Sequence, residues 1–280
     1  MGEPADLSER LTRNEARRLD RLSQLAVVAA REAAAQARLE GIAGERVGLV
    51  AGTGLGCVET TWRQLAGIAA RGLGHAEPLG FADSMDNAPA AHAAIALGCR
   101  GPSLTLTERE ISGEIALITG ALLLSARAVD AVVVVAGDAS SEEQRSAVLR
   151  FAPGLSPAEG AGAVVLESDE SASRRGAQVL GRLLGHAQAR TPLPFSPLRQ
   201  APAPLLDAAA SRALSLAGLS AEQVLSLPPE SLRGRLGWLM ADGVLRVVAG
   251  LLLLERDQRG AALVLGRARG GAAAALVLGR

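Results

Sequence analysis

The stretch ISGEIALITGALLLSARAVDAVVVVAGDAS, residues 111–140, decides the fold class of this chain. Its first part, SGEIALITGALLLSARA, has almost no polar face, which predicts a helix that is buried rather than amphipathic. Its second part, VDAVVVVAGDAS, is apolar at successive positions, as in a central parallel strand covered on both faces. A buried helix beside a doubly covered strand predicts an α/β protein with helices on both faces of its sheets.

The same alternation of strands and helices continues along the chain and predicts two halves. We assign residues 1–170 to an N-terminal half, 171–200 to a linking strand and a Pro-rich connection, and 201–280 to a shortened C-terminal half. Each half has one helix rich in Ala, Gly and Leu, so we expect both to lie between the sheets. The other predicted elements are a helix over 15–39 after a Ser8 cap, strands in RVGLVAG, SLTLT, EGAGAVVLES and AQVLGRLLGHAQAR, helices in VETTWRQLAGIAARG, AAHAAIALG, LDAAASRALSLAGLS and DGVLRVVAGLLLLERDQ, a loop over PLGFADSMDNAP, and a closing hairpin over GAALVLGRARGGAAAALVLGR.

Composition excludes several classes of function. The chain has 280 residues, of which 49% are hydrophobic, and its 29 basic residues, all Arg, balance 29 acidic ones. This balance gives no electrostatic case for nucleic acid or an anionic membrane as partner. The N-terminus lacks an apolar signal core, and the apolar stretch VLRVVAGLLLLERDQ contains Arg246 and is shorter than the ~20 residues of a membrane span. We therefore expect a cytoplasmic protein, with Cys57 and Cys99 as buried free thiols.

One candidate for chemistry is Glu110, between the strand SLTLT and the buried helix. Such a junction often holds a nucleophile, because helix N-terminal amides favour an anion. The glycines of AGTGLG do not have the GxGxxG spacing of a dinucleotide site. His92 is expected to be buried and structural, His75 solvated, and His186 has no neighbour at metal-ligand spacing. We expect neither a cofactor nor a metal.

Several motifs together resemble a known family. RVGLVAGTGLG, MDNAPAAHAAIALGCRGPSLTLT, ISGEIALITGALLLSARAVDAVVVVAGDAS and EGAGAVVLES occur in the order found in β-ketoacyl synthases of the thiolase superfamily. RLGWLMADGVLRVVAGLLLLERDQ and LGRARGGAAAALVLG resemble the later motifs of the same enzymes. The resemblance implies a thiolase-like α-β-α-β-α layered fold built from two related halves, here truncated at the N-terminus by the first strand and helix of the family.

The chain departs from this family at its catalytic positions. Family enzymes carry a cysteine three residues before the glycine that begins the buried helix, where this chain has Glu110. The stretch LSLPPESL replaces a histidine-bearing turn, and Trp238 replaces a second histidine. Condensation needs a thiolate to hold the acyl group and imidazoles to stabilise the enolate. The resemblance therefore implies no catalytic residue in this chain, with Glu110 and Trp238 at degenerate positions.

Within the family, this pattern is similar to that of the chain-length factor, a non-catalytic subunit of type II polyketide and aryl polyene systems. The resemblance implies a heterodimer with an active β-ketoacyl synthase, whose acyl tunnel this chain helps to shape, and contact with acyl carrier protein through that complex. Asp138 and Glu159 fall at structural turns of the family. The tunnel and interface positions implied are Leu79, Gly80, Phe81, Met85, Asn87, Leu104 and Leu106.

Two other functions stay open at this point. The first alternative is a malonyl-carrier-protein decarboxylase or hydrolase that uses Glu110 as base. The second is a scaffold that binds carrier proteins through surface arginines. If Glu110 has no chemical role, we expect it to form a salt bridge with an arginine of the companion chain.

Overall fold

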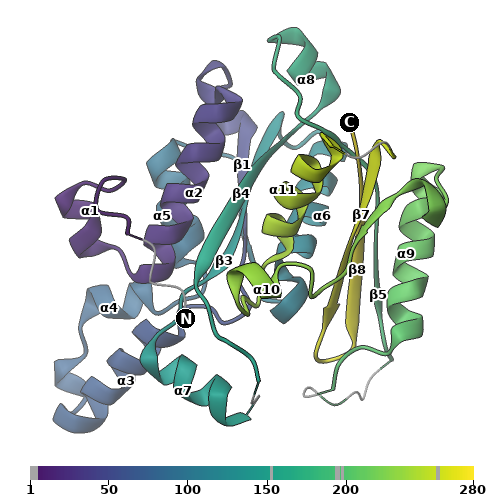
Figure 1. Cartoon of the computed structure of the whole chain (residues 1–280). Helices are drawn as coiled ribbons and strands as arrows, with labels where there is room; N and C mark the ends of the chain where they lie inside the picture. The colour runs from purple at the N-terminus through teal and green to yellow at the C-terminus, as the bar shows by residue number, and fades with distance from the viewer. Residues whose placement is uncertain (1–5, 152–153, 193–195, 197–198, 257–258) are drawn as a thin grey trace.

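The computed structural model describes residues 6–151, 154–192, 196, 199–256 and 259–280, and it consists of two four-stranded sheets with helices between and outside them (Figure 1). The helices are α1 (Arg13–Arg18), α2 (Arg21–Ala37), α3 (Val58–Arg71), α4 (Pro78–Asp83), α5 (Ala88–Leu97), α6 (Ser112–Ser125), α7 (Glu142–Phe151), α8 (Asp169–Arg174), α9 (Ala203–Ala217), α10 (Arg233–Leu236) and α11 (Gly243–Leu254), with short 3-10 turns η1 (Leu39–Gly41), η2 (Gly44–Arg46), η3 (Leu73–His75), η4 (Arg109–Ile111) and η5 (Ala221–Gln223). The strands are β1 (Val47–Gly52), β2 (Ser103–Leu106), β3 (Ala131–Asp138), β4 (Gly160–Glu167), β5 (Arg182–Arg190), β6 (Leu225–Leu227), β7 (Ala261–Ala268) and β8 (Ala272–Gly279).

The first sheet has the strand order β2-β1-β3-β4. Strand β1 runs parallel to both β2 and β3, while β4 runs antiparallel to β3, with Val134 opposite Val164. Every residue of β3 is buried, as the continuous apolar run predicted. Strand β2 lies at an edge and is partly exposed.

The second sheet repeats this pattern. Its order is β5-β8-β7-β6, with β6 parallel to β7 and β7 antiparallel to β8. Strands β6, β7 and β8 thus match β1, β3 and β4 in order and direction. Beyond β8 the second sheet continues with β5, which comes from the predicted linking segment and pairs antiparallel with β8. Among the described residues, no strand lies at the corresponding edge of β4.

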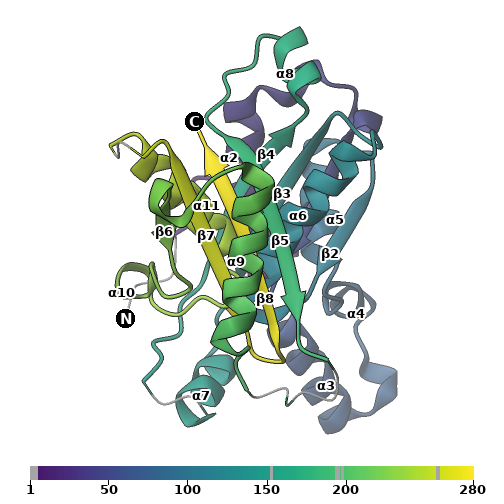
Figure 2. The ribbon, with the colours of Figure 1, turned by 90° about the vertical axis from the view of Figure 1, so that its right-hand side faces the viewer.

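Helices α6 and α11, one from each half, lie between the sheets, as expected (Figure 1). They approach so closely that a Cβ atom on Gly113 of α6 would lie 2.9 Å from the backbone nitrogen of Val244. Helices α2 and α5 cover the outer face of the first sheet, and α9 covers the outer face of the second (Figure 2). The layers are therefore helix, sheet, helix, sheet and helix, as predicted.

Three local predictions were wrong. The single helix predicted over 15–39 is two helices, because Thr12 forms a capping box with Glu15 and Asp20 caps a new helix by accepting a hydrogen bond from the Ser23 amide at 2.6 Å. The loop predicted over PLGFADSMDNAP contains helix α4, with Pro78 in its first turn. The strand predicted over AQVLGRLLGHAQAR begins only at Arg182.

No helix among the described residues is long and apolar enough to span a membrane. Cys57 is buried, whereas Cys99 is only partly buried.

Candidate functional site

The junction between β2 and α6 is a compact corner built around Ser112. The Ser112 hydroxyl lies 2.9 Å from the Thr53 carbonyl oxygen and 2.7 Å from that of Arg109, and it accepts a hydrogen bond from the Glu108 amide at 2.9 Å. Arg109 has a positive φ of 55°, which lets the chain turn sharply into η4. This corner places Glu110 in η4, directly before α6, at the junction where the sequence predicted it.

Glu110 is buried and is bound by an arginine of its own chain. Arg269 Nε donates to one carboxylate oxygen at 2.7 Å, and the Arg269 backbone amide donates to the other at 3.1 Å. The side chain of Glu110 is 9% exposed. Within its own chain, Arg269 thus engages both oxygens, and the expected salt bridge to a companion chain stays a prediction. The guanidinium of Arg269 also lies over the ring of Trp238, 5.7 Å from its centroid.

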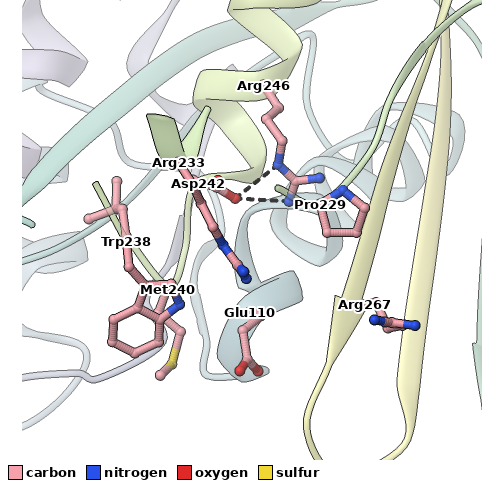
Figure 3. Close-up of a pocket in the computed structure, with 9 residues that line it drawn as sticks. Glu110, Pro229, Arg233, Trp238, Met240, Asp242, Arg246 and Arg267 are labelled. Carbon is pink, nitrogen blue, oxygen red and sulfur yellow. Dashed lines mark hydrogen bonds and ion pairs between the residues drawn. The ribbon is translucent and has the colours of Figure 1, made fainter. Parts of the chain in front are cut away.

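The structure brings the degenerate positions together. Glu110, Trp238 and Pro229, a proline of the stretch LSLPPESL, line one pocket, together with Arg233 and Met240 (Figure 3). The free volume in this pocket is about 10 Å³, which is room for about one water molecule. Side chains thus fill the space that an acyl group would need to reach Glu110.

A second ionic cluster lies between α6 and α11 and adjoins the pocket, because Asp242 and Arg246 also line it (Figure 3). Arg246 Nη2 donates to Glu114 at 2.5 Å, and Arg246 Nε donates to Asp242 at 2.9 Å. A third hydrogen bond runs from Arg246 to the carbonyl oxygen of Leu265. Glu114 and Arg246 are 0% and 1% exposed, so this cluster is in the core.

Burial and the opposite charges act against each other in this cluster, and burial prevails at the two carboxylates. It raises the pKa of Glu114 and of Asp242, although the charge of Arg246 opposes both shifts. For Arg246, burial acts to lower the pKa, but the two carboxylates outweigh it and the pKa is raised. The second carboxylate oxygen of Glu114 has no hydrogen-bond partner among the described residues.

Two glycines make room for the Glu114 carboxylate. A Cβ atom on Gly243 would lie 2.2 Å from one of its oxygens, and a Cβ atom on Gly266 would lie 2.3 Å from the other. Any larger residue at either position would displace the carboxylate. The cluster and its backbone surroundings are therefore fitted to each other.

Asp138 links the two halves near the same site. One of its carboxylate oxygens accepts hydrogen bonds from the Thr53 hydroxyl at 2.9 Å and from the backbone amides of Gly54 and Leu55 at 2.8 and 2.9 Å. The other accepts from the Ala241 amide at 2.7 Å. Burial raises the pKa of Asp138, and these four donors oppose the shift. Glu159, also assigned to a turn, forms an ion pair with Arg21 at 2.5 Å.

The residues predicted for the tunnel and interface lie apart from this pocket, on α4, β2 and the start of α5. Phe81, Met85 and Leu104 are 64%, 51% and 40% exposed. Asn87 is exposed and precedes α5, whereas Gly80 faces the Gln64 side chain of α3. Leu106 is partly buried and packs on the core between the sheets. The Leu79 side chain lies outside the described part of the structure.

No group of histidine, cysteine or carboxylate side chains that could hold a metal occurs among the described residues. His92 is partly buried and is bound to Asp83 at 2.9 Å, which agrees with a structural role, and His75 is exposed. His186 is partly buried in β5, and burial lowers its pKa.

Sequence reasoning missed the ionic partners around the corner. Arg269 is 159 residues from Glu110, so no local pattern connects them. The signals that could have indicated the deeper cluster were Glu114 in an otherwise apolar helix and Arg246 inside an apolar run. Isolated opposite charges in two helices expected to be buried predict an ion pair between them.

Comparison with known proteins connects this geometry to one family. Residues 3–150 match the model of the beta-ketoacyl synthase N-terminal domain. The chain is 25% identical over 205 residues to 3-oxoacyl-[acyl-carrier-protein] synthase 2 of Staphylococcus aureus (strain N315), covering 65% of this chain and 49% of that protein. It is 30% identical over 184 residues to nodulation protein E of Rhizobium meliloti (strain 1021), covering 60% and 46%. The chain thus spans about half the length of these relatives.

Solved structures share the fold. The ishigamide ketosynthase/chain length factor superimposes with a TM-score of 0.80 at 23% identity, covering 98% of this chain and 84% of the other. The ketosynthase complex AntDE:AntF, which contains a type II polyketide synthase acyl-carrier protein, superimposes with a TM-score of 0.76 at 18% identity, covering 92% and 84%. At these identities the likeness shows the fold alone.

Proposed function

Because this chain belongs to the beta-ketoacyl synthase family, we propose that it is a non-catalytic chain-length factor that pairs with an active β-ketoacyl synthase and helps to shape its acyl tunnel. The observation that carries the proposal is the nearly filled pocket around Glu110. Where the family has a nucleophilic thiolate, this chain has a carboxylate whose two oxygens are held by Arg269. Where it has histidines, this chain has the stretch LSLPPESL, whose Pro229 lines the pocket, and Trp238.

The chemistry of the pocket supports a role without bond formation. A carboxylate that attacked a thioester would form an anhydride, which water cleaves readily, so the acyl group would not be retained. Pro229 has no side-chain hydrogen-bond donor, and neither Pro229 nor Trp238 is an imidazole of the kind that the family uses for the enolate. The deeper cluster of Glu114, Asp242 and Arg246 fills the interior below the corner with charge, an unfavourable environment for an acyl chain.

The surface around β2 supports pairing with another subunit. In β2, Ser103 and Leu104 are exposed. Among the described residues, β2 pairs only with β1, so its other edge is open. An open strand edge with apolar side chains tends to associate with another chain. Helix α4 and the residues that follow it add the exposed side chains of Phe81 and Met85 to this side of the molecule.

The pocket disfavours the decarboxylase or hydrolase alternative. A general base must reach the substrate or its water within hydrogen-bond distance. Both oxygens of Glu110 are engaged by Arg269, and the pocket holds about one water. The structure offers no specific observation that favours a carrier-protein scaffold over the proposed subunit role.

The test is co-expression with the ketosynthase of the same gene cluster that retains the cysteine and both histidines. We expect a stable one-to-one complex on size-exclusion chromatography and condensation activity only in the complex. Phe81→Ala should shift the products of the complex to longer chains, while Leu216→Ala, at a side chain 61% exposed on α9, should not. Condensation by the isolated chain would refute the proposal, and unchanged products from a well-folded Phe81→Ala complex would refute the tunnel role.

A further inference from the structure

Helix α3 exposes its apolar face. Val58, Trp62 and Leu65 follow the i, i+4, i+7 spacing of one helical stripe, and their exposed fractions are 43%, 58% and 57%. In a helix of a globular domain, a stripe with this spacing normally packs on the core. We call these three residues the α3 stripe.

The polar side of α3 faces the protein instead. Thr60 is its buried residue. The Thr61 hydroxyl donates to the Ser84 carbonyl oxygen at 3.0 Å, and Gln64 Nε2 donates to the Glu77 carbonyl oxygen at 3.1 Å. These hydrogen bonds hold the two ends of α4 and thereby fix which side of α3 turns outward. The exposure of the α3 stripe is therefore built into the packing of α3 on α4.

The elements next to α3 also expose apolar side chains. Packing contacts run from β2 to α5, from α5 to α4 and from α4 to α3, and the four elements lie along one side of the molecule (Figure 2). Each contributes exposed apolar side chains, namely Leu104 on β2, Ile95 on α5, Phe81 on α4 and the stripe on α3. Leu73, next to α3, is 80% exposed. An apolar surface spread over neighbouring elements is typical of a protein interface.

We propose that α3 is a docking helix for the ketosynthase subunit, and that the α3 stripe becomes buried in the complex. This inference rests on the proposed function and extends the contact beyond β2 and α4. Because α3 packs on α4, α4 on α5 and α5 on β2, a subunit that covers β2 and Phe81 is the partner within reach of the α3 stripe. Helix α3 carries two arginines, Arg63 and Arg71, and one acidic residue, Glu59, which pairs with Arg63. It therefore lacks the densely basic face of a membrane-surface helix.

The chain provides its own optical probe for this contact. It has two tryptophans and no tyrosine. Trp238 is 5% exposed and Trp62 is 58% exposed, so a soluble quencher such as acrylamide reports mainly on Trp62. The experiment titrates the purified chain with a Trp-free variant of the ketosynthase of the same gene cluster. It measures the acrylamide quenching and the emission maximum of the tryptophan fluorescence of this chain. We expect quenching to fall at least twofold and the emission to shift to shorter wavelength.

Substitutions test the energetic role of the stripe. Leu65→Asp should weaken the complex at least tenfold, because it places a charge in a buried contact. Leu216→Asp is the matched control, since this leucine is 61% exposed on α9, on the outer face of the second sheet, and should leave affinity unchanged. Circular dichroism of both variants verifies that they fold, and Leu65→Ala serves as a milder variant if the aspartate disturbs α3.

The outcomes separate this inference from the proposed function. If Leu65→Asp binds the ketosynthase with wild-type affinity and Trp62 stays accessible to acrylamide in the complex, the docking role of α3 is overturned. The proposed role as a subunit then still stands. Absence of any complex overturns both. Protection of Trp62 by self-association without the ketosynthase assigns the stripe to a second copy, and protection by vesicles of phosphatidylcholine and phosphatidylglycerol assigns it to a membrane; either result overturns the inference.

Discussion

Replacing Arg246 by methionine tests whether the ionic cluster in the core holds the two central helices together. Methionine preserves much of the length of the side chain but removes the guanidinium. Glu114 and Asp242 then lose the partner that lies 2.5 Å from one and 2.9 Å from the other. The remaining carboxylates are 0% and 7% exposed, and the pocket that Asp242 lines has room for about one water, so the lost partner cannot be replaced by bulk water without opening the core.

We expect Arg246→Met to lower the free energy of unfolding by about 3–5 kcal/mol, the usual effect of removing one partner from a buried ion pair. This is a large part of a net stability of about 5–15 kcal/mol. Urea denaturation followed by circular dichroism measures the change as a shift of the midpoint. Arg235→Met is the control, because Arg235 is exposed and has no ion pair among the described residues, and it should change stability by less than about 0.5 kcal/mol.

The pH dependence has a definite sign. Burial raises the pKa of Glu114 above its ordinary value of 4.5, so the folded state binds a proton more readily than the unfolded chain. Without Arg246 this shift grows, and the loss of stability increases as the pH rises from below 4.5 through the raised pKa of the folded state. The defect of Arg246→Met should therefore be smallest in acid, and Glu114→Gln in the same background should recover part of it at neutral pH.

A loss below about 1 kcal/mol at pH 7, or a loss that does not depend on pH, would refute this reasoning. Either result would mean that water or a shift of the helices relieves the two carboxylates, and that the cluster is not a closed part of the core.

Two further predictions concern buried groups. Burial raises the pKa of the Cys57 thiol, with nearby Asp20 and Asp86 adding to the shift, and burial alone raises the pKa of Cys99. Both thiols should therefore react slowly with iodoacetamide at pH 8 and rapidly only in urea. Rapid labelling of Cys57 in the folded protein would contradict its burial. Asp138→Asn should lower stability by about 1.5–3 kcal/mol, because the amide group replaces one of two acceptor oxygens that serve four donors, and an unchanged urea midpoint would show that those donors have other acceptors.

Much of the layered fold could be predicted because its signals are local. The apolar run of β3 and the apolar circumference of α6 each indicate burial from their own residues. The break between α1 and α2 was missed because the apolar spacing continues across Leu19 while Asp20 starts a new cap. Helix α4 was missed because its proline and glycine also fit a loop.

The site was predictable in position but not in bonding. The sequence placed Glu110 at the corner and Trp238 at a second degenerate position, and the structure brings both to one pocket. The arginine that holds Glu110 comes from beyond β7, and this pairing depends on how the second sheet folds back over α6. Tertiary contacts of this kind have no periodicity that a reader of the sequence could follow.

The close contact between Gly113 and the start of α11 also has a mechanical consequence. A Cβ atom on Gly113 would lie 2.9 Å from the Val244 nitrogen, so the backbone of α6 packs almost directly on the backbone of α11. No flexible side chain lies between them at this point to absorb a relative movement. Sliding or hinging of one half against the other would have to separate these two helices before anything else could yield. A displacement imposed on the beginning of α6 is thus carried rigidly into the carboxyl-terminal half.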